Sequence, residues 1–473
     1  MGNVGISFGS PTSGQGFDVS TTVSAIVGNL QAVETPWKNQ LTALEAQDTA
    51  LTGIGTDLSS LSTAMASLYS FDGVLSEKEG SSSDDSVLAL TNATSSAVAG
   101  SHTLVVGQLA QTYSYASGAG AIGSGDTLSG SLTLNGQTIT ISDGTVTNSD
   151  GSTIPQNNTL ATLASYINQG NYGVQANAVR NAQGQSQLSL ISNTSGAAGS
   201  VTIDGSKLTD TTSSVTGFTF GQVQKGQDAQ LTVDGIATTS PSNTVTSAIT
   251  GVTMQLLDAA PGESVQVEIT NNNNDVETAV NTFVTAYNTV IRDLSTQEGN
   301  NSSGTAEPLF GNATIAMLQE QLQQAVNFTQ SSGSVTSLSQ LGITASASDD
   351  GTLTFDSSTL DSTLNSNYQG AMNFFQAASS GTSFGDNLTT TLEGLGNSGP
   401  NGLIYLALGQ NSSQESILNT NVTNEDTAIS AEQAQLTTEL NEANYTLQEI
   451  PTELQSVNEL YSAITGYNES PQG

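Results

Sequence analysis

The segment that decides the fold of the chain's two ends is VSAIVGNLQAVETPWKNQLTALEAQDTALTGIGTDLSSLSTAMASL, residues 23–68. Apolar residues recur in it at every seventh position, and further ones follow three residues after members of this series. This spacing is typical of a helix that packs against other helices along one face. The repeat consists of Val23, Leu30, Trp37, Leu44, Leu51, Leu58 and Met65. We therefore predict an N-terminal helical leg over residues 17–73, preceded by a flexible segment, residues 1–16.

Two glycines lie near the middle of this predicted helix. Gly53 and Gly55 are each expected to cost about 1 kcal/mol relative to alanine, because glycine loses the most backbone freedom in a helix. We therefore expect a bend or hinge near residues 52–56.

The C-terminal part of the chain, residues 412–473, repeats the pattern and is predicted to form a helical coiled coil. Its repeat includes Val422, Ile429, Leu436, Leu440, Leu447, Leu454 and Val457. Pro451 lies inside this repeat, and an interior proline costs about 3 kcal/mol, so we expect a kink or break there.

These two rows of apolar residues, the N-terminal and C-terminal seams, either pair with each other as an internal bundle or pack against other chains. Each seam is narrow. The free energy gained by burying its apolar side chains is small compared with the cost of the conformational entropy lost when so many residues become ordered. We therefore expect further helices to pack against both ends of the chain.

Between the two ends the apolar period changes to two, which is typical of β-strands. Asn135-Gly136 and Asp234-Gly235 each separate two alternating runs, and this is a strong signal for a β-hairpin. The predicted fold class is α+β and multidomain, with coiled-coil-like terminal helices that pair as a leg and antiparallel β-rich head domains inserted between them. The predicted domains are a β-rich domain at residues 74–118 plus 227–270, a second β-rich domain inserted at 119–226, and a helical stalk domain with a short β element at 271–411.

Composition excludes several classes of function. The chain has 473 residues, of which 42 are acidic and 6 basic, for a net charge of −36. Nucleic acid is excluded as a partner because phosphate binding needs a basic face, and membrane insertion is not expected because no apolar run approaches the roughly 20 residues that span a bilayer. The absence of cysteine excludes disulfides and thiol chemistry. The acidic excess also suggests adaptation to an acidic environment.

The sequence contains no arrangement typical of an active site. His102 is the one histidine and stands at the start of a predicted strand, where a structural role is expected. Adjacent carboxylates such as Asp84-Asp85 and Asp349-Asp350 point to different sides and suit turns better than acid/base catalysis. We predict that the protein is not an enzyme and has no catalytic residues, no metal site and no cofactor.

Six segments resemble, in order, the flagellar filament cap proteins, the flagellar hook-associated protein 2 family. The third of them resembles an insertion motif that cap proteins share with flagellins, and the fourth is the most specific. The segments are FGSPTSGQGFDVSTTVSAIVGNLQAVETP (8–36), SSSDDSVLALTNATSSAVAGSHTLVVGQLAQ (81–111), TLATLASYINQGNYGVQANAV (159–179), AQLTVDGIATTSPSNTVTSAITGVTMQLLDAAPGESVQVEIT (229–270), FVTAYNTVI (283–291) and LGITASASDDGTLTFD (341–356).

The resemblance implies a capping protein at the distal end of the bacterial flagellar filament, which promotes folding and polymerisation of exported flagellin and prevents its loss. It implies an extracellular location and export by the flagellar type III apparatus. Implied partners are flagellin, further copies in a homo-oligomeric ring, hook–filament junction proteins and an export chaperone. The two seams would then contact other copies or flagellin, with Gly53 and Gly55 as a hinge.

Two alternatives stay open at this point. The insertion motif alone fits a flagellin-like or hook–filament junction subunit equally well. A tip adhesin that binds glycans through exposed β-rich domains is the other alternative, and such cell adhesion is compatible with capping.

Overall fold

The computed structural model describes residues 15–118, 122–180, 182, 184–348, 350–376, 382–396 and 399–466. The chain divides into two compact units. The helical unit comprises residues 1–70 and 277–473, and the β unit comprises residues 71–276. The prediction of helices at both ends and antiparallel sheets between them is confirmed.

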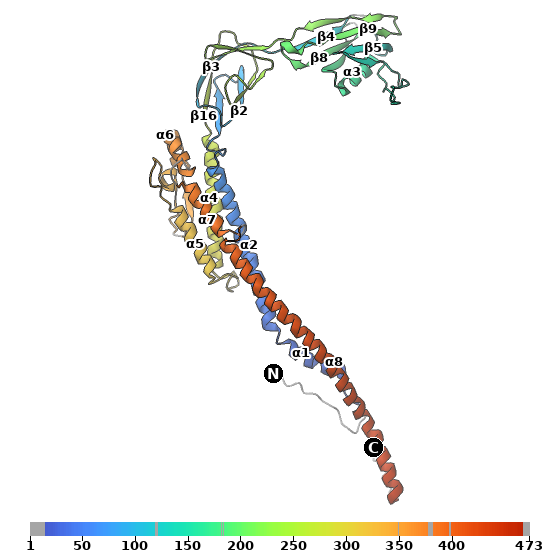
Figure 1. The fold of residues 1–473 in the computed structure, drawn as a ribbon, viewed down its shortest axis with the longest axis vertical. Helices are drawn as coiled ribbons and strands as arrows, with labels where there is room; N and C mark the ends of the chain where they lie inside the picture. The colour runs from blue at the N-terminus through green and yellow to red at the C-terminus, as the bar shows by residue number, and fades with distance from the viewer. Residues whose placement is uncertain are drawn as a thin grey trace. The chain divides into compact units, whose positions relative to one another are not determined.

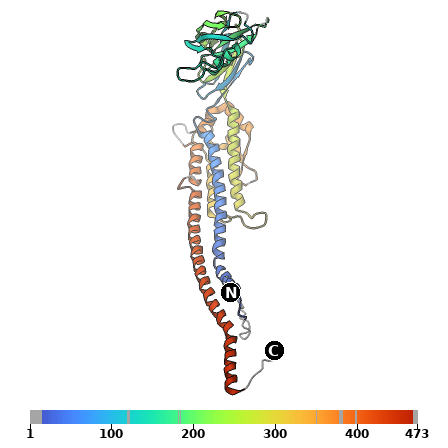
Figure 2. The same cartoon turned by 90° about the vertical axis from the view of Figure 1, so that its right-hand side faces the viewer.

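The helical unit is built from both ends of the chain. Figures 1 and 2 show α1 and α2 lying along α8. No helix in the described part of the chain has an apolar stretch long enough to cross a bilayer. The helices of this unit are α1 (Val19–Gln31), α2 (Thr35–Tyr69), α4 (Asn273–Gln297, which begins in the β unit), α5 (Ala313–Val326), α6 (Ser357–Phe375), α7 (Phe384–Leu395) and α8 (Leu403–Thr465).

Local sequence sets where the first two helices begin. Asp18 caps α1, because its carboxylate accepts the Thr21 amide hydrogen at 3.1 Å. Pro36 lies in the first turn of α2, where a missing N–H costs no helical hydrogen bond. The segment between these helices is short, so α1 and α2 follow each other along the same partner, α8.

A short β element completes the helical unit. The 3₁₀ helix η2 (Leu338–Leu341) leads into β17 (Ile343–Ala345), which pairs antiparallel with β18 (Leu353–Phe355). The buried Asn288 of α4 holds β18 in place, because its side-chain amide donates to the Leu353 carbonyl at 2.8 Å and accepts the Leu353 N–H at 2.7 Å.

The β unit contains antiparallel sheets and the helix α3 (Leu160–Gln169). The sheet orders are β1-β16-β3-β12-β13, β14-β15-β2, β10-β9-β5-β6 and β11-β4-β8-β7. The elements are β1 (Lys78–Ser82), β2 (Leu88–Ala93), β3 (Gly100–Gln108), β4 (Thr112–Ser117), β5 (Leu128–Leu134), β6 (Gln137–Thr140), β7 (Val174–Arg180), β8 (Ser186–Ser195), η1 (Ala197–Gly199), β9 (Ile203–Asp210), β10 (Thr216–Phe218), β11 (Phe220–Gln224), β12 (Ala229–Val233), β13 (Ile236–Ser240), β14 (Thr244–Val245), β15 (Val252–Leu256) and β16 (Val265–Asn271).

Both predicted hairpins are present. Asn135 and Gly136 join β5 to β6, and Asp234 and Gly235 join β12 to β13. All four residues have positive φ, between 51° and 82°. This is the conformation that Asn-Gly and Asp-Gly turns favour, because their twist matches that of the strands.

Two separate clusters of buried residues form the core of the β unit. The residues of one cluster come from two stretches of the chain, from Val87 to Ala110 and from Ala229 to Ile269. The other lies between Ile122 and Phe218. Each cluster draws on one of the two predicted β-rich domains, whose exact boundaries stay a prediction.

The break expected at Pro451 is wrong, and a kink there stays a prediction. Helix α8 continues through Pro451 as a single element of 63 residues, so the proline does not break it. Proline leaves the carbonyl four residues earlier without its helical donor. Pro451 and Leu447, whose carbonyl is left free, are both half-buried, so water can solvate this carbonyl.

Helix α2 likewise runs without interruption through Gly53 and Gly55. The helix is therefore not interrupted there, and the bend or hinge expected near residues 52–56 stays a prediction. Gly53 is exposed, whereas Gly55 is buried against the rest of the helical unit.

Candidate assembly surface on the helical unit

The N-terminal seam lies mostly inside the helical unit. Val23, Leu44, Leu51, Leu58 and Met65 are all buried. Leu30 and Trp37 are half-buried. In this conformation the buried members belong to the chain's own core, so they offer no surface to a second chain.

The C-terminal seam is covered much less. Only Ile429 is buried, and Val422, Leu436, Leu440 and Leu447 are half-buried. The structure brings parts of both seams together in one cluster around α1 and α8. That cluster consists of Val19, Val23, Val27 and Ile429, with Phe17, Leu30, Leu436 and Leu440 packed against it.

The pairing of the two chain ends extends to Asn444. The Asn444 side-chain oxygen accepts the Phe17 amide hydrogen at 2.8 Å. Gly16 has a φ of 63°, and a Cβ at this position would lie 2.1 Å from the same oxygen. Glycine is therefore required here for the chain to approach α8 closely.

Beyond Asn444, α8 carries apolar side chains that the described part of the chain leaves exposed. Leu454 is 44% exposed, Val457 61% and Ile464 74%. We call Leu454, Val457, Leu460, Tyr461 and Ile464 the terminal apolar stripe. Leu454, Val457, Tyr461 and Ile464 continue the three- and four-residue spacing of the seam, and Leu460 lies beside them. The sequence analysis did not select Leu460, although its position three residues after Val457 fits a helical stripe.

The charges beside the stripe are acidic. Glu449, Glu453 and Glu459 lie in the same part of α8, which has no lysine or arginine along its length. Within the described helical unit, the lysine nearest the chain ends is Lys38, whose Nζ lies 2.6 Å from Glu34 Oε2. The hydrogen bond to Glu34 raises the pKa of Lys38. The exposed end of α8 therefore combines an apolar stripe with negative charge, and suits a partner surface that is apolar and neutral or basic.

Replacing Gly53 with alanine is expected to stabilise α2 by about 1 kcal/mol, because alanine is the better helix former. A Cβ at Gly53 meets no atom within 4 Å, so nothing opposes the gain. Thermal unfolding followed by helical circular dichroism measures the effect. Gly28→Ala in α1 is the control, since Gly28 is equally open and lies outside the predicted hinge. A Gly53→Ala variant that is less stable than the unaltered protein would contradict the prediction.

Two carboxyl groups on α2 and α4 make the stability of the helical unit depend on pH. Burial, together with the hydrogen bond and the charge of Asp293, raises the pKa of Asp57 to about 6. An aspartate in the unfolded chain has a pKa of about 3.9, so the folded protein binds the proton more tightly. This contribution to stability is complete below about pH 4 and is lost as the pH rises through about 6.

Asp57→Asn is therefore expected to raise the free energy of unfolding at about pH 7.5 by about 1 kcal/mol, a value discounted for solvent screening of a partly exposed group. At about pH 4 the gain should disappear. Chemical denaturation across this pH range measures both values. Asp356→Asn is a control for which the pH dependence of stability has the opposite sign. The Ser358 and Thr359 hydroxyls lower the pKa of Asp356 in the folded protein. An equal effect of Asp57→Asn at both pH values would contradict the assignment.

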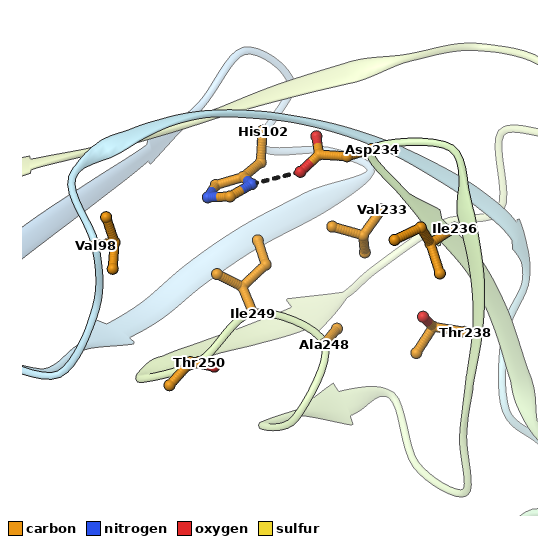
Figure 3. Close-up of a pocket in the computed structure, with 9 residues that line it drawn as sticks. All are labelled: Val98, His102, Val233, Asp234, Ile236, Thr238, Ala248, Ile249 and Thr250. Atoms are coloured by element: carbon orange, nitrogen blue, oxygen red, sulfur yellow. Dashed lines mark hydrogen bonds and ion pairs between the residues drawn. The ribbon is translucent and has the colours of Figure 1, made fainter.

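His102 lies at a cavity of about 310 Å³ in the β unit (Figure 3). Its Nδ1 is 2.7 Å from Asp234 Oδ2, and Asp234 Oδ1 accepts the Thr103 amide hydrogen at 2.9 Å. The hydrogen bond with His102, followed by that from Thr103, lowers the pKa of Asp234. The sequence analysis missed Asp234 as the partner of His102. The pair ties the β12–β13 turn to β3, which agrees with the structural role predicted for His102.

Other carboxylates close turns. Asp84 Oδ1 accepts the Ser86 amide hydrogen at 3.0 Å and the Ser86 hydroxyl at 2.6 Å. Asp350 accepts the Thr352 amide hydrogen in the same way at 3.0 Å, and Asp349 lies outside the described residues. The described residues contain no cluster of three or more His, Asp or Glu side chains that would hold a metal ion.

These observations define a class of protein in which both chain ends build one helical unit and β-rich domains are inserted between them. The chain belongs to the flagellar hook-associated protein 2 family. The family model "Flagellar hook-associated protein 2 N-terminus" matches residues 15–113, and "Flagellar hook-associated protein 2 C-terminus" matches residues 226–460.

Relatives and a solved structure agree with this assignment. The B-type flagellar hook-associated protein 2 of Pseudomonas aeruginosa is 27% identical over 336 residues, which is 62% of this chain and 65% of that protein. The flagellar hook-associated protein 2 of Escherichia coli K12 is 28% identical over 402 residues, 81% of this chain and 84% of that protein. The crystal structure of the D1-D2-D3 domains of the flagellar cap protein FliD from Escherichia coli matches with a TM-score of 0.57 and 26% identity, covering 77% of this chain and 99% of that one.

Proposed function

We propose that this protein caps the distal end of the bacterial flagellar filament, where it promotes folding and polymerisation of exported flagellin and prevents its loss. Membership of the hook-associated protein 2 family and the similarity to a flagellar cap protein support this function. The observation that carries it is the terminal apolar stripe. Its side chains are exposed in the single chain, and their burial against another surface stabilises the association of the two surfaces.

The partner surfaces follow from this exposure. The exposed end of α8 contacts flagellin at the open end of the filament, and other copies of the chain complete a homo-oligomeric ring. The narrow contact suits a cap that has to hold its position and also release it as subunits are added, since burial of a few apolar side chains gives moderate affinity.

The proposal includes a location and a route. The protein acts outside the cell at the filament tip. It is exported by the flagellar type III apparatus with the help of an export chaperone. It then reaches the growing end above the hook–filament junction proteins. Its role is structural and needs neither catalysis nor a cofactor. The His102–Asp234 pair supports this view, because it is engaged in holding a turn.

A complementation experiment tests the proposal. The protein, carrying an epitope tag in the exposed β12–β13 turn, is expressed together with the flagellin of its own organism in a motile strain that lacks its cap protein. Restored filaments with immunogold label confined to their tips are the expected result. Label along the whole filament would identify a flagellin-like subunit instead, and cells that export flagellin without forming filaments would contradict capping.

A further inference from the structure

A second cavity, of about 570 Å³, lies in the helical unit beside the β17–β18 hairpin. It is lined from α4 by Tyr287, from the end of α5 by Gln323 and Asn327, and from η2 and β17 by further serine and threonine residues. None of the lining side chains carries a charge at neutral pH. The lining combines these hydroxyl and amide groups with apolar side chains such as Phe328 and Ile343.

Tyr287 is the residue that marks this cavity as a binding site. Its side chain is fully buried, and its hydroxyl has no hydrogen-bond partner within the described part of the chain. Burial raises the pKa of Tyr287 to about 12, so the hydroxyl stays protonated and able to donate. A buried polar group without a partner costs about 1–3 kcal/mol, whereas a bound hydroxyl would recover this cost.

Neighbouring polar groups show the contrast. Asn288, next to Tyr287 on α4, makes two hydrogen bonds to Leu353. Tyr69 donates its hydroxyl to Asp386 Oδ1 at 2.7 Å. In the described helical unit, Glu34 Oε1 and Gln330 Oε1 are also buried without a partner, and of these three atoms the Tyr287 hydroxyl belongs to a residue that lines the cavity.

We propose that this cavity binds an uncharged, hydroxyl-rich ligand of the size of a mono- or disaccharide, with the Tyr287 hydroxyl and the Gln323 amide among the groups that bond it. A cation would need carboxylates in the lining, and an anion would need basic side chains. A wholly apolar ligand would leave the hydroxyls and amides unpaired. A sugar offers hydroxyls to these groups and an apolar C–H face to Phe328, and a cavity of this volume lies within the range of ligand sites.

Isothermal titration of the full-length protein with maltose, cellobiose and N,N′-diacetylchitobiose tests the proposal. Saturable binding of at least one of them is expected, and Tyr287→Phe should weaken it about tenfold, the effect of one lost hydrogen bond to a buried group. The same substitution should raise the unfolding midpoint of the unligated protein, because it removes an unpaired hydroxyl. Gln323→Ala, at an exposed position, should weaken binding without a change in that midpoint.

Tyr69→Phe is the matched control, since it removes a hydroxyl that has a partner outside the cavity. It should lower the unfolding midpoint and leave sugar binding unchanged. The proposal is overturned if none of the three sugars binds at about 20 mM, a concentration that detects even millimolar affinity. It is equally overturned if Tyr287→Phe binds as tightly as the unaltered protein, or if an uncharged serine- and threonine-rich peptide binds where the sugars do not.

Discussion

Replacing Leu454, Val457, Leu460 and Ile464 with glutamine is expected to stop filament growth while the protein stays folded. Each apolar side chain contributes about 1.5–3 kcal/mol when another surface buries it completely, so losing four of them removes several kcal/mol of affinity for a partner. That loss corresponds to a weakening of at least a thousandfold. Glutamine is a good helix former, and all four positions are exposed, so α8 should remain helical.

Filament length in the complemented strain, measured by electron microscopy, is the readout. Helical circular dichroism and the unfolding midpoint of the purified variant establish that it is folded. The control replaces Val98, Val223 and Ile236 with glutamine, because these side chains are 70–76% exposed but lie in the β unit. Filaments of normal length from the α8 variant would contradict the role proposed for the stripe. A defect in the control alone would indicate that the contact surface lies in the β unit instead.

The heptad spacing was sufficient to predict helices at both ends of the chain, but not the interruption between α1 and α2 or which of their residues would be covered. Leu51 and Val457 occupy equivalent positions in the two seams, yet Leu51 is fully buried and Val457 is 61% exposed. The difference comes from neighbours that are distant in sequence. Helix α2 packs against both α7 and α8, whereas Leu454, Val457 and Ile464 near the end of α8 are exposed. Periodicity indicates that a face will be buried, and it does not say which chain buries it.

The cavities could not be predicted from the sequence for a similar reason. The Asp234-Gly235 turn was predicted from local preference, but the contact between Asp234 and His102 depends on β12 pairing with β3. Tyr287 lies in the predicted helical stalk domain, where nothing in the sequence distinguishes it from an ordinary core residue. Its unpaired hydroxyl becomes visible only when α4, α5 and the β17–β18 hairpin are in place.

Phe384→Ala is expected to be the most destabilising single substitution in the helical unit. Phe384, at the start of α7, stacks on Phe374 with ring centroids 5.3 Å apart and meets Phe283 edge-on at 5.9 Å. Phe375 and Phe328 lie 6.0 and 6.5 Å away. Its side chain is fully buried, so truncation leaves a cavity at the centre of an aromatic cluster and costs about 3–5 kcal/mol.

This loss should act on the helical unit alone, because the β unit has buried clusters of its own. Hydrogen exchange measured by mass spectrometry should show faster exchange in α4 and α7, with β3 and β12 unchanged. Phe310→Ala is the control, since Phe310 is 58% exposed and its truncation should cost less than about 1 kcal/mol. Equal exchange in the two variants would show that the cluster does not support the unit. Because α7 packs directly against α2, loosening it should also free the helix that carries the N-terminal seam, so this variant should be defective in capping although Phe384 is buried inside its own chain.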